Sequence, residues 1–201
     1  MNMKVLVFYD MHGSLSALRS IRSVVKKKDP DLIICGGDIT IFEDGLIELV
    51  DRIARLKKPV LMIPGNHESD EEMEAVCSLY DNVHYIHKSF HRIKNHVFLG
   101  WGGGGFAQVD SEFERFVKSN IKKKFKKGDK LILVTHGPPF KTKLDDLYGD
   151  HVGNTSYTKF IKKHKPKFAF SGHIHETSGR SDKMGSTKLH NPGPKGRIFS
   201  L

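Results

Sequence analysis

The sequence predicts an α/β fold in which parallel strands alternate with helices. Apolar runs of strand length recur along the whole chain, and several of them are separated by segments with an apolar residue every three to four positions. Alternation of this kind is typical of parallel strands joined by helical crossovers. With 201 residues, no repeat and no long linker, the chain is expected to form a single domain over residues 1–201.

The predicted strands are the short apolar runs of the sequence. The first covers residues 4–9, and the last covers residues 197–201 at the end of the chain. Between them the same criterion predicts strands at 32–35, 60–63, 83–87, 97–101, 131–135 and 168–171.

The predicted helices lie between these runs. The first follows Ser14, which can cap it, and places four apolar side chains on one face: Leu15, Leu18, Ile21 and Val25. Another begins at Ser69, because Ser69 and Glu72 have the spacing of a capping box. Further helices are expected at 45–55, 111–124 and 155–164.

Two segments are interpreted as loops. The glycine-rich segment 101–106 is either a mobile segment beside a functional site or a plain connection. Residues 136–154 lack periodicity, and loops of this length are usually functional or disordered. We expect this second loop to shape a substrate pocket. Of the histidines outside the motifs, which are expected to be surface or packing residues, His151 in this loop is the best candidate for a functional role.

Composition restricts the class of protein. Hydrophobic residues make up 38% and charged residues 28%, a globular rather than a membrane balance, and runs such as 131–134 are far shorter than the ~20 residues that span a bilayer. The N-terminal MNMKVLVFYD has no small-residue cleavage site, so a cytoplasmic location and no membrane partner are expected. Cys35 and Cys77 lack a CxxC partner, which fits a reducing compartment.

The net charge of +10 raises the question of a nucleic-acid partner. The lysines, however, cluster at 26–28, 122–127 and 162–165, near the C-terminal ends of predicted helices. Cations there complement the helix dipole and need no ligand. Nucleic acid therefore remains an alternative partner that the sequence does not favour.

Polar residues able to hold a metal follow most of the predicted strands. In chain order they are Asp10 and His12, Asp38, Asn66 and His67, His136, and His173 and His175. Strand ends in one parallel sheet lie side by side, and residues two apart on a strand face the same way, so these side chains are expected to converge. Each segment alone is weak evidence, but together they predict one metal site.

The motifs DMH, GGD, GNHE, THG and GHIH occur in the order found in the calcineurin-like metallophosphoesterase family, which this sequence resembles over residues 4–194. The resemblance implies a layered α/β/β/α sandwich of two mixed sheets flanked by helices. It also implies two divalent metal ions that share Asp38. Asp10, His12 and His175 would complete the first site, and the second would use Asn66, His136 and His173. One departure is Tyr9, where many members have a small residue, and this affects packing only.

The donor set is oxygen and nitrogen without thiolate, which suits manganese, iron, zinc, cobalt or nickel. Two divalent ions carry about four positive charges, and two carboxylates neutralise only part of them, so the site should attract an anion. The hypothesis for the mechanism is that a hydroxide bridging the metals attacks phosphorus in line, while His67 gives a proton to the leaving oxygen. Glu68 is expected to orient the ligands from the second shell.

The resulting prediction is a binuclear metal-dependent phosphohydrolase acting on a phosphate ester. A phosphodiesterase is preferred slightly over a monoesterase, because no dedicated cationic pocket for a dianion is identifiable. One alternative is a nuclease acting on DNA or RNA, although the chain lacks the appended region with which such members grip a duplex. The other is a protein-binding scaffold of the same fold, which the intact His67 and ligand positions disfavour.

Overall fold

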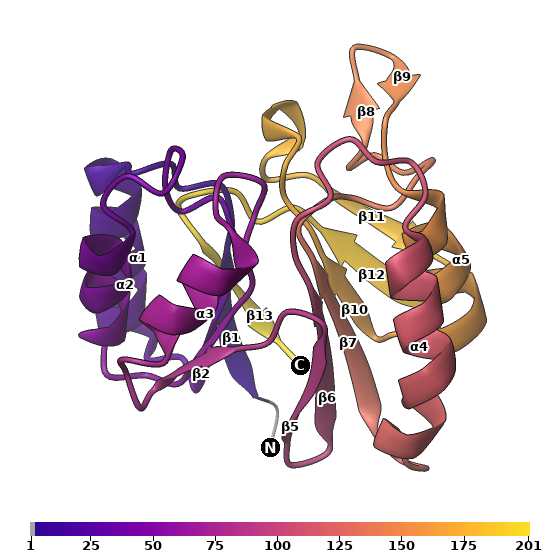
Figure 1. The fold of residues 1–201 in the computed structure, drawn as a ribbon, viewed down its shortest axis with the longest axis horizontal. Coiled ribbons are helices and arrows are strands. Elements are labelled where there is room, and N and C mark those ends of the chain that lie inside the picture. The colour runs from indigo at the N-terminus through magenta and orange to yellow at the C-terminus, as the bar shows by residue number, and fades with distance from the viewer. Residues whose placement is uncertain (1–2) are drawn as a thin grey trace.

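Two β-sheets lie face to face in the computed structural model, which describes residues 3–201, and helices cover the outer face of each sheet (Figure 1). The layers therefore follow the order helix, sheet, sheet, helix. This confirms the layered α/β/β/α sandwich of two mixed sheets that the family resemblance implies.

The first sheet has five strands in the order β13-β1-β2-β3-β4. Its strands are β1 (Lys4–Phe8), β2 (Leu32–Cys35), β3 (Val60–Met62), β4 (Val83–Tyr85) and β13 (Arg197–Ser200). The first four are parallel, and β13 pairs antiparallel with β1. Its outer face is covered by α1 (Leu15–Lys28), α2 (Leu46–Ala54) and α3 (Asp70–Cys77).

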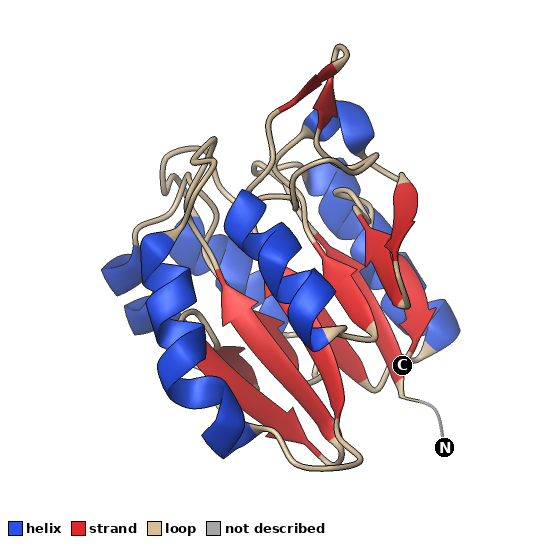
Figure 2. Ribbon diagram, turned by 90° about the vertical axis from the view of Figure 1, so that its right-hand side faces the viewer, coloured by secondary structure: helices blue, strands red, loops and turns tan. Residues whose placement is uncertain are grey.

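The second sheet has six strands in the order β11-β12-β10-β7-β6-β5. They are β5 (Ser89–Ile93), β6 (His96–Trp101), β7 (Lys130–Thr135), β10 (Phe168–Phe170), β11 (Ser181–Met184) and β12 (Thr187–His190). Strands β6, β7, β10 and β12 are parallel, whereas β5 and β11 are antiparallel at the two edges. The helices α4 (Ser111–Lys124) and α5 (Thr155–His164) cover its outer face, the side that Figure 2 turns toward the viewer.

Alternation along β1 shows how the apolar layers form. Val5 and Val7 point between the two sheets, whereas Leu6 and Phe8 point toward the outer helices, and all four are fully buried. A strand buried on both faces has a continuous apolar sequence, which is why VLVF was recognisable as a strand. Met11 packs in the helix layer, and Tyr9 is buried between the sheets.

Each of the eight predicted strands is present, with bounds within two residues of those expected. The strands that were missed are β5, β11, β12, and the hairpin strands β8 (Asp146–Leu147) and β9 (Asp150–His151). Segments such as SDKM and TKLH carry mostly polar side chains, so no apolar run marks them. They are strands because neighbouring backbone groups pair with them, which is a tertiary effect.

The predicted capping box at the start of α3 is only half present. Ser69 Oγ accepts from the amide of Glu72 at 3.3 Å, as expected. The Ser69 amide, however, donates to Glu43 Oε1 at 2.6 Å instead of to Glu72. The carboxyl of Glu72 contacts Glu43, whose hydrogen bond and charge raise the pKa of Glu72. The loop before α2 thus supplies the cap.

The helices begin at the upper edge of the sheets in Figure 1 and run away from it, as α4 shows. The lysine clusters in the last turns of α1, α4 and α5 lie at their C-terminal ends, as the sequence predicts. Basic charge therefore gathers at the edge opposite to the loops that follow the parallel strands. Within residues 3–201, no helix is long and apolar enough to cross a membrane.

The segment 136–154 is ordered around one buried carboxylate. Asp145 accepts hydrogen bonds from the amides of Thr142 (2.7 Å) and Gly153 (3.0 Å), and its Oδ1 lies 2.9 Å from His151 Nδ1. The hairpin β8–β9 projects from the top of the molecule in Figure 1. His151 therefore binds Asp145, and it is not one of the side chains that gather after the parallel strands.

Replacing Asp145 with Ala should destabilise the protein, because several buried donors lose their acceptor. We expect a loss of roughly 3 kcal/mol in the free energy of unfolding, measured by urea denaturation. Asp150→Ala, which removes an exposed carboxylate from the same hairpin, is the control and should change stability by less than about 0.5 kcal/mol. Equal stabilities of the two variants would contradict this role.

Candidate metal centre

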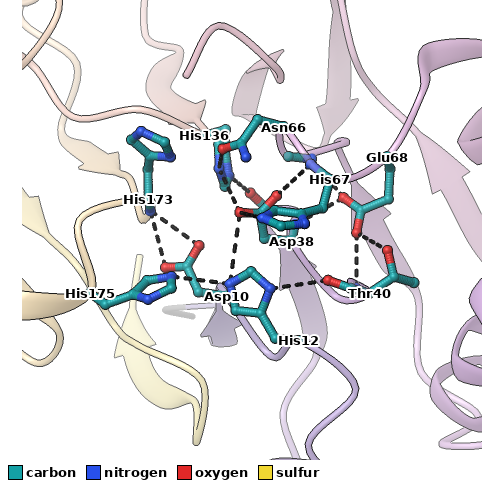
Figure 3. A network of polar contacts seen from close by, with 12 residues as sticks. Asp10, His12, Asp38, Thr40, Asn66, His67, Glu68, His136, His173 and His175 are labelled. Carbon is teal, nitrogen blue, oxygen red and sulfur yellow. Dashed lines mark hydrogen bonds and ion pairs between the residues drawn. The ribbon is translucent and has the colours of Figure 1, made fainter. Parts of the chain in front are cut away.

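All eight residues that the sequence predicted for the site lie together at one edge of the sandwich (Figure 3). Asp10 and His12 follow β1, Asp38 follows β2, and Asn66 and His67 follow β3 of the first sheet. The second sheet contributes His136 after β7, and His173 and His175 after β10. Convergence is as predicted, but the expectation of one parallel sheet is wrong, because the residues come from two facing sheets.

Within residues 3–201, three overlapping groups could hold a metal ion, and each has its candidate ligand atoms within 4.8 Å of one another. They are Asp10 with His12 and His175, Asp38 with His136 and His173, and His12 with Asp38 and His67. The first two groups correspond to the two halves of the predicted site. The third places His67 beside the same carboxylate.

Asp38 lies at the centre of the cluster. Its Oδ2 is 3.3 Å from His136 Nε2 and 3.8 Å from His12 Nε2, and its Oδ1 accepts from the amide of His67 at 3.0 Å. Gly65 is required beside it, because a Cβ at that position would overlap Asp38 Oδ1. One carboxylate therefore faces histidines from both sheets.

Asp10 is held by the chain that carries the last two histidines. Both of its oxygens accept from the amide of His173, at 3.1 and 3.0 Å. A Cβ at position 172 would lie 2.6 Å from Asp10 Oδ2, so glycine allows this close approach.

Strand alternation does not explain the convergence of Asp10 and His12, contrary to the prediction from the sequence. Strand β1 ends at Phe8, and both residues lie beyond it with φ of 54° and 44°, in the left-handed region. The same holds for His173, with φ of 68°, whereas His175 begins the short helix η1 (His175–Thr177). These side chains meet through tight turns rather than through strand alternation, since the backbone has already left the sheet.

Backbone carbonyl groups orient two of the histidines. His136 Nδ1 lies 3.0 Å from the carbonyl of Gly36, and His12 Nδ1 lies 3.0 Å from the carbonyl of Thr40. A carbonyl oxygen only accepts, so Nδ1 carries a proton, and in the neutral ring Nε2 presents its lone pair to the site. His12 Nε2 and His175 Nε2 approach to 3.0 Å.

These contacts fit a pair of divalent cations. Nε2 lone pairs from several histidines converge on two buried carboxylates, and the donors are nitrogen and oxygen throughout. Nε2 of His173 is buried and has no hydrogen-bond partner among residues 3–201, which a bound metal would correct.

The pKa values in the cluster reflect its buried charges. Burial raises the pKa of Asp38, but the hydrogen bond and charge of His136 outweigh it and lower that pKa to about 2. Burial lowers the pKa of His136, yet the neighbouring Asp38 and Asp10 carboxylates raise it to about 9. Burial and the charge of His136 lower the pKa of His173 to about 4. Burial raises the pKa of Asp10.

Glu68 connects the loops behind the cluster, in keeping with the orienting role expected from the sequence. Its buried carboxylate accepts from the amides of Asp38 and Gly65, both at 2.9 Å. It also accepts from the amide of Thr40 at 2.9 Å and from the Thr40 hydroxyl at 2.7 Å. Four donors from two loops thus meet one side chain.

Sequence reasoning missed three residues around the cluster. Thr40 orients His12 through its carbonyl, and its only signal was a hydroxyl two positions after Asp38. The Phe42 amide donates to His67 Nδ1 at 3.3 Å, and the Phe106 ring lies 4.5 Å from that of His173. Nothing in the local sequence marked either phenylalanine. Phe106 places the glycine-rich segment 101–106 beside the site, as the first of the two interpretations expected, while the mobility of the segment stays a prediction.

Glu68→Gln should weaken metal binding, because an amide cannot accept from all four donors and the loops that carry Asp38 and Gly65 loosen. Changes behind metal ligands typically cost about 10-fold to 100-fold in affinity. Titration calorimetry with Mn²⁺ measures this effect. Glu71→Gln, an exposed neighbour on α3, is the matched control and should retain the native affinity. Unchanged binding by Glu68→Gln would refute the orienting role.

Comparisons with known proteins agree with this geometry. The family profile of the calcineurin-like phosphoesterases matches residues 3–177. No curated protein matches the sequence.

Solved structures share the fold at low sequence identity. The protein TT1561 of Thermus thermophilus has a TM-score of 0.77 and 15% identity, covering 100% of this chain and 99% of that chain. Phosphopantetheinyl hydrolase of Mycobacterium tuberculosis has a TM-score of 0.67 and 14% identity, covering 94% and 88%. A dimetal phosphatase of Danio rerio has a TM-score of 0.60 and 9% identity, covering 93% and 86%. With most of its length matched by the family profile, the chain belongs to the calcineurin-like phosphoesterases and is a hydrolase of phosphate esters.

Proposed function

We propose that this protein is a binuclear metal-dependent phosphodiesterase whose active site is the cluster around Asp38. The proposal rests on one observation: two buried carboxylates lie among histidines from both sheets. In each of the three groups that they form, the candidate ligand atoms are within 4.8 Å of one another. In this proposal Asp10, His12, His175 and the shared Asp38 hold one divalent ion. Asn66, His136, His173 and the same Asp38 hold the other.

Two such ions would supply an activated water and positive charge for the phosphoryl oxygens. The charge balance favours this use, because two carboxylates leave a pair of divalent ions with excess positive charge. Manganese, iron, zinc, cobalt and nickel all fit a nitrogen and oxygen donor set.

His67 is proposed as the general acid for the leaving oxygen. Its Nδ1 accepts from the Phe42 amide, so Nε2 carries a ring proton that can be donated in a hydrogen bond to the leaving oxygen. Nε2 lies on the side of the cluster, 4.0 Å from Asp38 Oδ2. A proton at Nε2 is therefore directed toward the position where the ester oxygen departs.

A diester is favoured over a monoester because, within residues 3–201, no lysine or arginine makes a hydrogen bond or ion pair with a site residue. A dianionic phosphate would gain most from such a partner. The monoanion of a diester needs less positive charge.

The two alternative functions are less well supported. A nuclease would bring lysines to the site, but the clusters at the ends of α1, α4 and α5 lie at the opposite edge. A scaffold has no need for the complete set of candidate ligands. We further propose that residues 1–201 act as one unit in the cytoplasm, where Cys35 and Cys77, both buried as thiols, stay reduced.

Replacing His67 with Ala should lower kcat on bis-p-nitrophenyl phosphate by roughly 100-fold or more, because a general acid contributes on that scale. Binding of Mn²⁺, measured by calorimetry, should persist, since His67 is not a proposed ligand. His164→Ala, at the far end of α5, is the control. Lost metal binding would make His67 a ligand, and near-native turnover would remove the acid role.

Metal affinity should rise with pH between about 6.5 and 9. The neighbouring carboxylates raise the pKa of His136 to about 9, and its Nε2 binds metal only after losing its proton. Below that pKa each pH unit should strengthen binding by roughly tenfold, with a proton released to the buffer. Calorimetry with Mn²⁺ in buffers of different ionisation enthalpy tests this. Affinity that does not change between pH 6.5 and 8.5 would contradict it.

A further inference from the structure

Phe42 is an exposed aromatic residue in an unfavourable backbone conformation. Its side chain is 77% exposed, and its φ of 49° is in the left-handed region, followed by Glu43 at 66°. A bulky side chain seldom adopts this conformation, and an exposed one gains no packing that would offset it. Such conformations concentrate where a site requires them.

The turn that carries Phe42 is fixed to the segment around His67 at two points. The Phe42 amide donates to His67 Nδ1, and Glu43 Oε1 accepts from the Ser69 amide. The two rings lie 4.6 Å apart, tilted by 45°. Phe42 therefore sits against the residue proposed to protonate the leaving oxygen.

Beyond Phe42 the surface opens into a cleft of about 860 Å³ between α2 and α3. Ile47, Val76 and Tyr80 contribute apolar surface to it. Among the described residues, no lysine or arginine lines this cleft, whereas several carboxylates do: Glu43, Asp44, Glu48, Asp51 and Glu72. Arg52 and Arg55 form ion pairs with Glu48 and Asp51, so the repulsion of a leaving group that carries further negative charge would come from Glu43, Asp44 and Glu72.

We propose that Phe42 is the specificity-determining residue for the leaving group, and that the substrates are phosphate esters whose leaving alcohol is flat, apolar and not anionic. The inference rests on the proposed phosphodiesterase function and on the role of His67. A flat ring that stacks on Phe42 places its ester oxygen toward His67 and its far end toward the cleft. Polynucleotides are disfavoured, because their leaving group is a polyanion.

Phe106 provides a matched control within the same site. It is also an exposed phenylalanine, at 60%, and its ring also lies against a site histidine, His173. It differs in its location, because it follows β6 of the second sheet and contacts His173 rather than His67. Only Phe42 is expected to govern the preference for the leaving group.

The test is competitive inhibition of the Mn²⁺-loaded protein by the monomethyl esters of phenylphosphonate and methylphosphonate, which are monoanions like a diester and differ only in the ring. The wild type should bind the phenyl compound more tightly, and Phe42→Ala should reduce that preference by roughly tenfold. Phe42→Tyr should keep it, and Phe106→Ala should leave it at the wild-type value. Circular dichroism and Mn²⁺ binding verify that the variants are folded and loaded.

A second pair of ligands tests the charge of the cleft. A carboxylate added at the para position of the phenylphosphonate ester should weaken binding by about fivefold or more, and Asp44→Asn should reduce this penalty. An unchanged phenyl preference in Phe42→Ala, or an equal loss in Phe106→Ala, would overturn the inference and leave the phosphodiesterase proposal standing. Failure of both phosphonates to bind would overturn the proposed function and this inference with it.

Discussion

The buried contact between Asp38 and His136 joins the two halves of the sandwich. Asp38 belongs to the first sheet and His136 to the second, and their Oδ2 and Nε2 atoms are 3.3 Å apart with almost no exposure. A buried charge of this kind is tolerated only when its partner is in place. The facing edges of the two sheets must therefore hold a fixed separation, which the apolar layer between them provides.

The loops at this edge obtain their shape from backbone conformations that are costly in isolation. Asp10, His12, Asp38 and His173 all have positive φ. Each such residue is disfavoured by about 1–2 kcal/mol, and persists where surrounding contacts determine it. Those contacts are visible: Glu68 collects four donors, and the carbonyls of Gly36 and Thr40 fix two imidazoles. These hydrogen bonds offset the cost of the backbone conformations that hold the candidate ligands in place.

Charge is distributed unevenly over the molecule, and the distribution bears on function. The net charge of +10 comes largely from lysines, which gather at helix ends away from the cluster. The surface next to His67 is acidic instead. The net charge therefore does not describe the local field at the site, because screening by salt limits the electrostatic influence of an exposed lysine to about 10 Å. The separation of the lysines from the site explains why a basic protein need not bind nucleic acid there.

Local sequence was sufficient for the elements that carry their own signal. Strands buried on both faces, such as VLVF and LIIC, are continuous apolar runs, and Ser14 and Asn154 cap helices through their own side chains. The identities of the candidate ligands were also available, because metal chemistry restricts the residue types and each follows an apolar strand. Edge strands such as SDKM carried no such signal.

What the tertiary structure alone decided is how separate segments meet. It placed the candidate ligands on two facing sheets, replaced strand alternation by left-handed turns, and made Glu43 the acceptor of the Ser69 amide at the start of α3. It also set Phe42 against His67. Each depends on contacts between residues distant in the chain, whose geometry is determined only when the layers pack. By itself the sequence determined the residue types of the candidate site and the strands that are continuous apolar runs, because those depend on residue type and local period.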